Sequence, residues 1–115
     1  MILIKMALAH IKNTKDWQSQ VVDSPNPVFI DFWAEWCGPC RMVGPVVEEL
    51  AKDYEGKVSF VKVNVDEANE LAAKYNIFSI PTLMLMHKGQ VLAQQVGAAS
   101  KESYKGMIDR ALSKT

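Results

Sequence analysis

The segment from Val28 to Trp33 constrains the fold of this 115-residue chain more than any other feature. Its six residues, Val-Phe-Ile-Asp-Phe-Trp, are apolar at both alternating sets of positions, except at Asp31. A strand with two apolar faces needs other elements packed on both of its sides, as in a sheet that helices cover. The segment therefore predicts a central strand in a layered α/β domain.

The rest of the chain alternates between strand-like and helix-like patterns. Strands are predicted at residues 7–12, 28–33, 58–65, 81–87 and 90–96, and helices after Asn13 or Thr14, at 42–54, at 67–75 and after Ser100. Strands separated by helices pair in parallel through right-handed crossovers, whereas the tight Lys88-Gly89 connection predicts an antiparallel hairpin. We expect one domain over residues 1–115, with a central mixed five-stranded sheet flanked by four helices.

Helix boundaries are predicted from capping residues and prolines. The helix at 42–54 shows one apolar stripe, made of Met42, Val43, Val46, Val47, Leu50, Ala51 and Tyr54. Pro45 should kink this helix, because it removes one backbone hydrogen bond. Asp66 is expected to cap the helix Glu67–Tyr75, and Ser100 the last helix.

The N-terminal run from Met1 to Ala9 is apolar except for Lys5. A secretory signal segment would place its cleavage site at Ala7-Leu8-Ala9. The run is short for such a segment and has no basic leading region. We interpret it as a tail that leads into the first strand, and we assign no role to the extension over residues 1–6.

Charge and cysteine content exclude several classes of protein. Thirteen basic and thirteen acidic residues cancel, and no basic run predicts binding to nucleic acid. Two cysteines cannot build the disulfide framework of a small secreted domain. Zinc usually needs four nitrogen or sulfur ligands, and the only histidines, His10 and His87, fall in strand patterns far from the cysteines. We therefore expect no metal site and interpret the cysteine pair as chemically active.

The cysteines lie where a strand pattern gives way to a helix pattern, in Trp36-Cys37-Gly38-Pro39-Cys40. The thiolate is the reactive form of cysteine, and free N–H groups at a helix N-terminus favour negative charge there. Cys37 is therefore predicted to attack a partner disulfide, and Cys40, one helical turn on, to resolve the mixed disulfide.

Asp31 is the only charged residue in the central strand pattern. Burial raises the pKa of a poorly paired carboxyl group, which makes it a suitable general base for Cys40. In the alternative interpretation, Asp31 is a structural carboxylate paired with a residue such as Lys62.

Two motifs carry a family resemblance. Asp31 to Cys40, Asp-Phe-Trp-Ala-Glu-Trp-Cys-Gly-Pro-Cys, resembles the active-site signature of the thioredoxin family almost unbroken, and Ile80-Pro81-Thr82 is similar to its second motif. The resemblance extends over nearly the whole chain from about Ala7. It implies the thioredoxin fold and a small disulfide reductase that carries electrons through a Cys37–Cys40 disulfide, without any other cofactor.

The resemblance also implies the setting in which the protein works. We expect a cytoplasmic monomer whose partners are thioredoxin reductase and disulfide-containing protein substrates, with no part for nucleic acid or membrane. A binding subunit that uses the same fold without turnover is the alternative function.

A docking surface follows from the same resemblance. In the family, the proline that matches Pro81 follows a cis peptide bond and faces the disulfide, so that the backbone of the preceding residue can pair with a substrate strand. The residues expected to line this surface are Trp36, Gly38, Pro39, Ile80, Pro81 and Gly97. Phe78 either adds an exposed apolar contact beside the cysteines, which would change the choice of partner, or packs inward.

Overall fold

The computed structural model describes residues 8–115. The strands are β1 (Ala9–His10), β2 (Val28–Trp33), β3 (Ser59–Asn64), β4 (Thr82–His87) and β5 (Gln90–Val96). The helices are α1 (Thr14–Trp17), which continues as the π-helical η1 (Gln18–Val22), α2 (Gly38–Asp53), α3 (Asn69–Lys74) and α4 (Lys101–Leu112). The extension over residues 1–6, and with it most of the apolar N-terminal run, lies outside the described residues.

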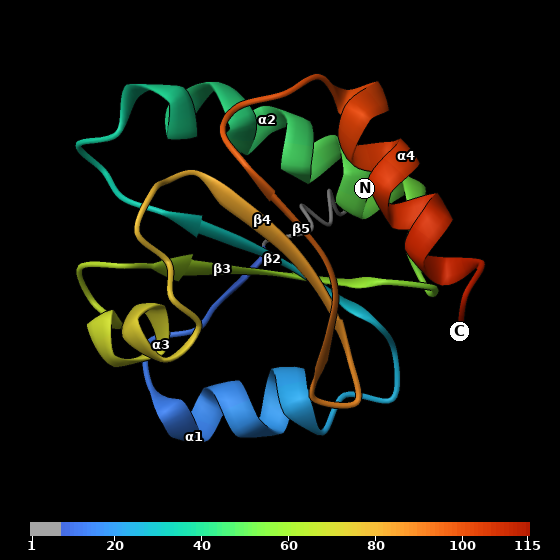
Figure 1. Cartoon of the computed structure of the whole chain (residues 1–115), viewed down its shortest axis with the longest axis horizontal. Helices are drawn as coiled ribbons and strands as arrows, with labels where there is room; N and C mark the ends of the chain where they lie inside the picture. Colours follow the sequence, from blue (N-terminus) through green and yellow to red (C-terminus); the bar gives the residue numbers. More distant parts are fainter. Residues whose placement is uncertain (1–7) are drawn as a thin grey trace, which may run out of the picture.

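The five strands form one mixed sheet in the order β1-β3-β2-β4-β5. Strands β1, β3 and β2 are parallel, whereas β4 is antiparallel to both of its neighbours. Figure 1 shows α2 and α4 over one face of the sheet and α1 and α3 over the other. The predicted five-stranded mixed sheet with four helices is confirmed, and β2 has the predicted central place.

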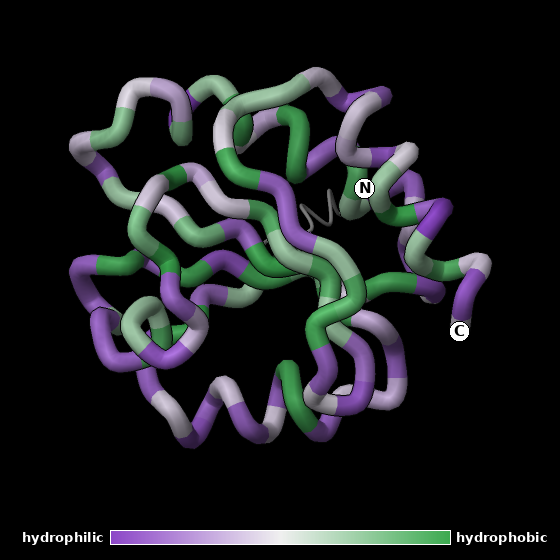
Figure 2. Tube along the Cα trace, viewed as in Figure 1, coloured by the Kyte–Doolittle hydropathy of each residue, from purple (hydrophilic) through white to green (hydrophobic). Residues whose placement is uncertain are grey.

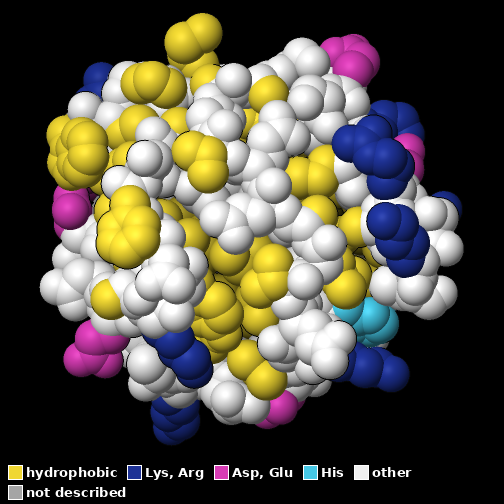
Figure 3. Space-filling model, viewed as in Figure 1, with side chains coloured by type: hydrophobic (Ala, Val, Ile, Leu, Met, Phe, Trp, Pro, Cys, Tyr) yellow, Lys and Arg dark blue, Asp and Glu magenta, His cyan; other side chains and the backbone are white. Residues whose placement is uncertain are grey.

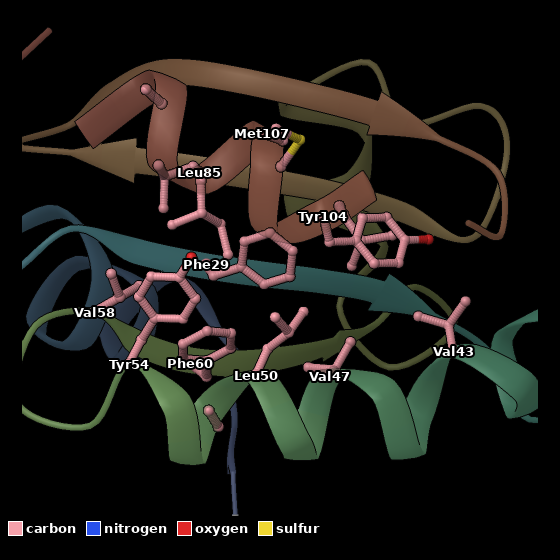
Figure 4. Packing of buried hydrophobic residues seen from close by; sticks show 14 residues of the cluster. Phe29, Val43, Val47, Leu50, Tyr54, Val58, Phe60, Leu85, Tyr104 and Met107 are labelled. Atoms are coloured by element: carbon pink, nitrogen blue, oxygen red, sulfur yellow. The ribbon is translucent and has the colours of Figure 1, made fainter. Parts of the chain in front are cut away.

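Alternate residues of β2 point into two separate cores. Phe29 belongs to the core under α2 and α4, while Ile30 and Phe32 belong to the core under α1 and α3. Figure 4 shows Phe29 and Leu85 between the side chains of α2 and those of α4. Hydrophobic residues accordingly concentrate in the strands, and the segment from α1 to η1 is mostly hydrophilic (Figure 2). The two apolar faces of β2 thus explain why the domain has three layers, with the sheet between two layers of helices.

The second core is closed by an aromatic pair from distant parts of the sequence. The rings of Trp17 and Tyr75 lie 5.1 Å apart between centroids, and the Trp17 indole donates a hydrogen bond of 3.2 Å to the Tyr75 hydroxyl. Trp17 is buried. This contact joins α1 to the end of α3.

Two caps and one turn form as predicted. The Asn13 side chain accepts a hydrogen bond of 2.8 Å from the backbone of Asp16, and the Ser100 hydroxyl accepts one of 3.1 Å from Ser103. In the β4–β5 hairpin, Lys88 and Gly89 have φ angles of 53° and 79°. Two successive positive φ angles are those of a tight hairpin turn that matches the twist of the strands.

The predicted apolar stripe of α2 is wrong at Met42, which is 74% exposed. The helix begins earlier than predicted, at Gly38, and continues past Pro45 to Asp53. Its buried side is set by Val43, Val47 and Leu50. Met42 lies about 100° around the helix from Val43, which places it at the border of this side. The kink expected at Pro45 stays a prediction.

The prediction that Asp66 caps a helix at Glu67 is also wrong. Helix α3 starts at Asn69, after Ala68, and no side chain caps it. The Asp66 carboxylate instead accepts a hydrogen bond of 2.8 Å from the Trp36 indole, and its own backbone N–H bonds to the Asn64 side chain at 2.9 Å. The Asp66 carboxylate, which the local sequence predicted to cap a helix, thus binds Trp36, a residue distant in the sequence.

Candidate active site

The two cysteines are joined by a disulfide at the N-terminus of α2. Their Cα atoms lie 5.3 Å apart, and the Cys40 backbone N–H donates a hydrogen bond of 3.2 Å to Cys37 Sγ. Cys37 is the N-cap, Gly38 and Pro39 form the start of the helix, and Cys40 lies in its first turn. Pro39 is tolerated because the first N–H groups of a helix have no partner within it. The Cys37 sulfur therefore sits where backbone dipoles stabilise negative charge.

Exposure does not separate the two cysteines. Cys37 is 5% exposed and Cys40 4%. What differs is their surroundings: Cys37 Sγ lies 3.8 Å from the backbone oxygen of Ile80, whereas Cys40 belongs to the helix. The two cysteines therefore differ in their neighbours and in their positions at the start of α2, and not in their exposure.

Three segments that are distant in the sequence meet beside the disulfide. The Ile80–Pro81 peptide bond is cis, as the resemblance implied, and it brings the Ile80 carbonyl to Cys37. The Gly97 N–H donates a hydrogen bond of 2.8 Å to the Pro81 carbonyl. Gly97 has a φ angle of 96°, which residues with a Cβ rarely adopt. The start of α2, the loop before β4 and the end of β5 thus form one continuous site.

A tyrosine holds the Gly97 segment in place. The buried Tyr104 hydroxyl donates a hydrogen bond of 3.0 Å to the Gly97 carbonyl and accepts one of 3.0 Å from the Ala99 N–H. Because Tyr104 also packs in the core with Phe29, the loop after β5 is anchored to the interior. No local sequence pattern marks this contact of the Tyr104 hydroxyl.

Asp31 is a buried carboxylate in the middle of β2. It is 1% exposed, and neither of its oxygens has a hydrogen-bond partner among residues 8–115. Burial raises the pKa of Asp31 to about 6, and the nearby positive charge of Lys62 opposes that rise. Asp31 alternates with Ile30 and Phe32, so it points to the face of the sheet that α2 covers, and the first turn of α2 carries Cys40.

The alternative interpretation, an ion pair between Asp31 and Lys62, is not formed in the described part of the chain. The two residues are opposite each other in the β2–β3 register. The Lys62 ammonium lies instead 4.4 Å from the centroid of the Trp33 ring. Lys62 therefore acts on Asp31 through its charge and not through a direct contact.

Comparison with known proteins assigns the sequence to one family. The sequence model of the family described as Thioredoxin matches residues 8–110. The chain belongs to the thioredoxin family. It is 48% identical to thioredoxin C-2 of Corynebacterium nephridii over 89% of this chain and 96% of that protein. It is 50% identical to a thioredoxin of Chlorobaculum thiosulfatiphilum, over 83% of this chain and 88% of the relative.

Membership in the thioredoxin family gives the disulfide its function. Among the relatives is also thioredoxin 1 of a Nostoc species, 50% identical over 84% of this chain and 90% of its own length. The chain has the thioredoxin fold and is a thiol–disulfide oxidoreductase of the protein-disulfide reductase class. Its redox-active centre is the Cys37–Cys40 disulfide.

The surface around this thioredoxin-type disulfide is apolar. Trp36 is 69% exposed while its indole N–H is held by Asp66. Phe78 is 88% exposed, so it does not pack inward. Met42 and Val96 also expose large apolar side chains, and neither was singled out as a surface residue from the sequence. The position of Val96 directly before Gly97 is the signal that could have marked it.

Residues 8–115 contain neither a candidate metal cluster nor a helix that could span a membrane. No group of three or more histidine, cysteine, aspartate or glutamate side chains there is arranged to hold a metal ion. None of the helices in that range has both the length and the apolar character needed to cross a membrane.

Proposed function

We propose that Cys37 is the attacking cysteine and Cys40 the resolving cysteine in the reduction of protein disulfides. The observation that carries the assignment is the place of Cys37 Sγ, at the N-cap of α2 and 3.8 Å from the Ile80 carbonyl. A thiolate at this place is stabilised by the helix N-terminus and by the Cys40 N–H. Cys40 belongs to the first turn of the helix, within bonding distance of Cys37.

The reaction takes two exchange steps. In the dithiol form, the Cys37 thiolate attacks one sulfur of a partner disulfide, which forms a mixed disulfide and releases the first partner thiolate. The Cys40 thiolate then attacks Cys37 Sγ, which forms the Cys37–Cys40 bond and releases the second partner thiolate. Two electrons pass to the partner, and its two thiolates take up the two protons that the enzyme thiols lose.

We assign to Asp31 the acceptance of the proton from the Cys40 thiol. A carboxyl group whose pKa lies near 6 is largely ionised at neutral pH and still basic enough to accept a proton. Neither oxygen has a hydrogen-bond partner within residues 8–115, which leaves the group free to do so. Lys62 modulates this step through its charge.

The docking surface that we propose consists of five exposed or half-buried residues around Cys37, together with the buried Pro81. The residues are Trp36, Gly38, Pro39, Ile80, Pro81 and Gly97. The backbone of Ile80 would pair with an extended substrate segment and so hold the target disulfide against Cys37 Sγ. None of the six side chains carries a charge, so shape and apolar contact would govern docking.

The wider setting is proposed from the family. The relatives are named thioredoxins, so a thioredoxin reductase is the natural donor that returns the disulfide to the dithiol. The partners on the other side are proteins with accessible disulfides. We propose one domain over residues 1–115 that works as a cytoplasmic monomer, with the cysteine pair as its only redox group. Nucleic acid and membrane have no part in this proposal.

A binding subunit without turnover is the second candidate function. The bonded cysteine pair and the unpaired buried Asp31 favour turnover, because a docking module needs neither.

Reduction of insulin disulfides by dithiothreitol tests the roles of the two cysteines. We expect the Cys37→Ser variant to lose the catalysed rate, and the Cys40→Ser variant to accumulate mixed disulfides with its partners. The Cys37→Ser/Cys40→Ser double variant is the control that should trap no partner. Full activity of either single variant would contradict the assigned roles.

A further inference from the structure

Phe78 is the most exposed large apolar side chain among residues 8–115. It is 88% exposed, ahead of the other four in that class, which are Trp36, Met42, Val91 and Val96. Moving a phenylalanine side chain from water to an apolar site favours the buried state by roughly tenfold or more. Residues 8–115 leave the Phe78 ring almost fully exposed, so a bound partner can supply the contact that buries it.

The position of Phe78 relative to the disulfide follows from the backbone. Ile80, whose carbonyl oxygen lies 3.8 Å from Cys37 Sγ, is only two residues further along the chain. Two extended residues span at most about 7 Å. A polypeptide whose disulfide reaches Cys37 therefore passes within side-chain reach of Phe78.

The loop that carries Phe78 is fixed on both sides of it. Before Phe78, the Ile77 N–H donates a hydrogen bond of 2.8 Å to the Ala72 carbonyl, and Ile77 packs against the core under α1 and α3. After it, the Ser79 carbonyl accepts a hydrogen bond from the Thr82 hydroxyl. A ring displayed from a fixed backbone loses little conformational entropy when a partner covers it.

The surface around Phe78 is continuous with the redox site. Figure 3 shows apolar side chains gathered on the left of the molecule, where the turn before α2 and the loop between α3 and β4 meet. Trp36 comes from the turn before α2 and Phe78 from the loop before β4, so the two exposed rings flank the Cys37 region from different segments. Val96, exposed and opposite Thr82 in the sheet, borders it on the β5 side.

We propose that Phe78 selects substrates: it favours oxidised polypeptides that carry a large apolar side chain two residues from the target cysteine. Successive side chains of an extended segment alternate in direction, so residues two apart lie on the same side. A segment paired with Ile80 through its backbone would thus place one such side chain against Phe78. The inference rests on the proposed function, because it requires substrate docking at Ile80 and Cys37.

The test uses short peptides that each contain one cysteine, joined by a disulfide to a chromogenic thiol. The peptides differ only at the positions two residues before and two residues after the cysteine, where leucine or serine is placed. The measured quantity is the ratio of kcat/KM for the leucine peptide to that for the serine peptide. It is determined for wild type, for Phe78→Ser and for Val91→Ser.

We expect the wild type to prefer the leucine peptide on one side of the cysteine by about tenfold, and Phe78→Ser to lose most of that preference. Val91 is the matched control, because it is an exposed apolar residue at the hairpin end of β5, opposite Met86. Its variant should keep the wild-type ratio.

The other outcomes contradict either the role of Phe78 or the proposed function. An equal ratio in wild type and Phe78→Ser, with both peptides still reduced, would overturn the role of Phe78 and leave the proposed function intact. Sedimentation showing that Phe78 instead joins two copies of the chain, with an unchanged ratio, would do the same. Reduction of neither peptide by wild type would contradict the proposed function itself, and the inference with it.

Discussion

Lys62 lies directly opposite Asp31 in the sheet, but its ammonium group rests over the Trp33 ring. The ring face attracts the cation, while both Asp31 oxygens stay without a hydrogen-bond partner in the described part of the chain. The effect of burial on the pKa of Asp31 consequently exceeds the opposing effect of the Lys62 charge, and the pKa rises to about 6. Stability, rate and titration all depend on this arrangement.

Replacing Asp31 with asparagine should stabilise the protein at neutral pH. Its carboxyl pKa rises from 3.8 to about 6 on folding, so between these values the folded state binds more protons than the unfolded state. Wild-type stability therefore falls as pH rises through this window. We expect Asp31→Asn to gain up to about 3 kcal/mol at pH 8 and almost nothing below pH 4, by guanidinium denaturation.

The control for this prediction is Asp23→Asn, which changes an exposed carboxylate. It should alter the free energy of unfolding by no more than about 0.5 kcal/mol at either pH. A gain in Asp31→Asn that is the same at pH 4 and pH 8 would show that the buried charge is not its source.

The same substitution should slow the second exchange step at neutral pH. Without the carboxylate, the Cys40 thiol has to lose its proton to water, and general bases typically contribute about a hundredfold. The rate of resolution of a preformed mixed disulfide, followed by rapid mixing, should therefore fall by a factor of ten to about a hundred at pH 7. The difference should narrow at pH 9, where hydroxide can deprotonate Cys40. Equal rates in the two proteins at pH 7 would remove Asp31 from the step.

Removing the positive charge of Lys62 should move the titration of Asp31 upward. Lys62 lowers the pKa of Asp31 against the effect of burial, so Lys62→Met should place the midpoint above that of the wild type, which is about 6. Carbon NMR of the Asp31 carboxyl group measures the shift directly. Lys114→Met, at an exposed position in the last residues of the chain, is the control and should leave the midpoint in place. A midpoint that falls in Lys62→Met would contradict the prediction.

Most of the fold follows from local patterns, because it depends on residues close together in the sequence. The two apolar faces of Val28 to Trp33 predict a central strand, and the Lys88-Gly89 turn predicts the hairpin. The widening of the first helix into a π-helical segment at Gln18–Val22 has no such signal. A π-helical turn holds about one residue more than an α-helical turn, and this changes the spacing of apolar residues too little to be recognised in a short segment.

The parts of the site that sequence patterns missed depend on contacts between distant residues. Trp36 and Asp66 are thirty positions apart, so the tendency of aspartate to cap a helix was the only visible signal, and it misled. The approach of Ile80 to Cys37 was expected only through the family resemblance. Phe78 stayed undecided because a loop residue has no periodicity from which its direction could be inferred.

The hydroxyl group of Tyr104 should matter for activity more than for stability alone. It bridges the Gly97 carbonyl and the Ala99 N–H, and Gly97 in turn bonds to Pro81 beside the disulfide. Tyr104→Phe removes both hydrogen bonds and should lower the free energy of unfolding by about 1–2 kcal/mol. Because the loop after β5 then loses its anchor to the core, we also expect kcat/KM for insulin reduction to fall several-fold.

Tyr75→Phe is the matched variant that separates the two effects. The Tyr75 hydroxyl accepts a hydrogen bond from Trp17 in the core under α1 and α3, the opposite side of the sheet from Tyr104. Its loss should lower stability by a similar amount and leave kcat/KM unchanged, since the Tyr75 hydroxyl, as far as residues 8–115 show, is hydrogen-bonded to Trp17 and not to the redox site. If both variants reduce insulin at the wild-type rate, the Gly97 segment does not need the Tyr104 anchor, and the hydroxyl serves folding only.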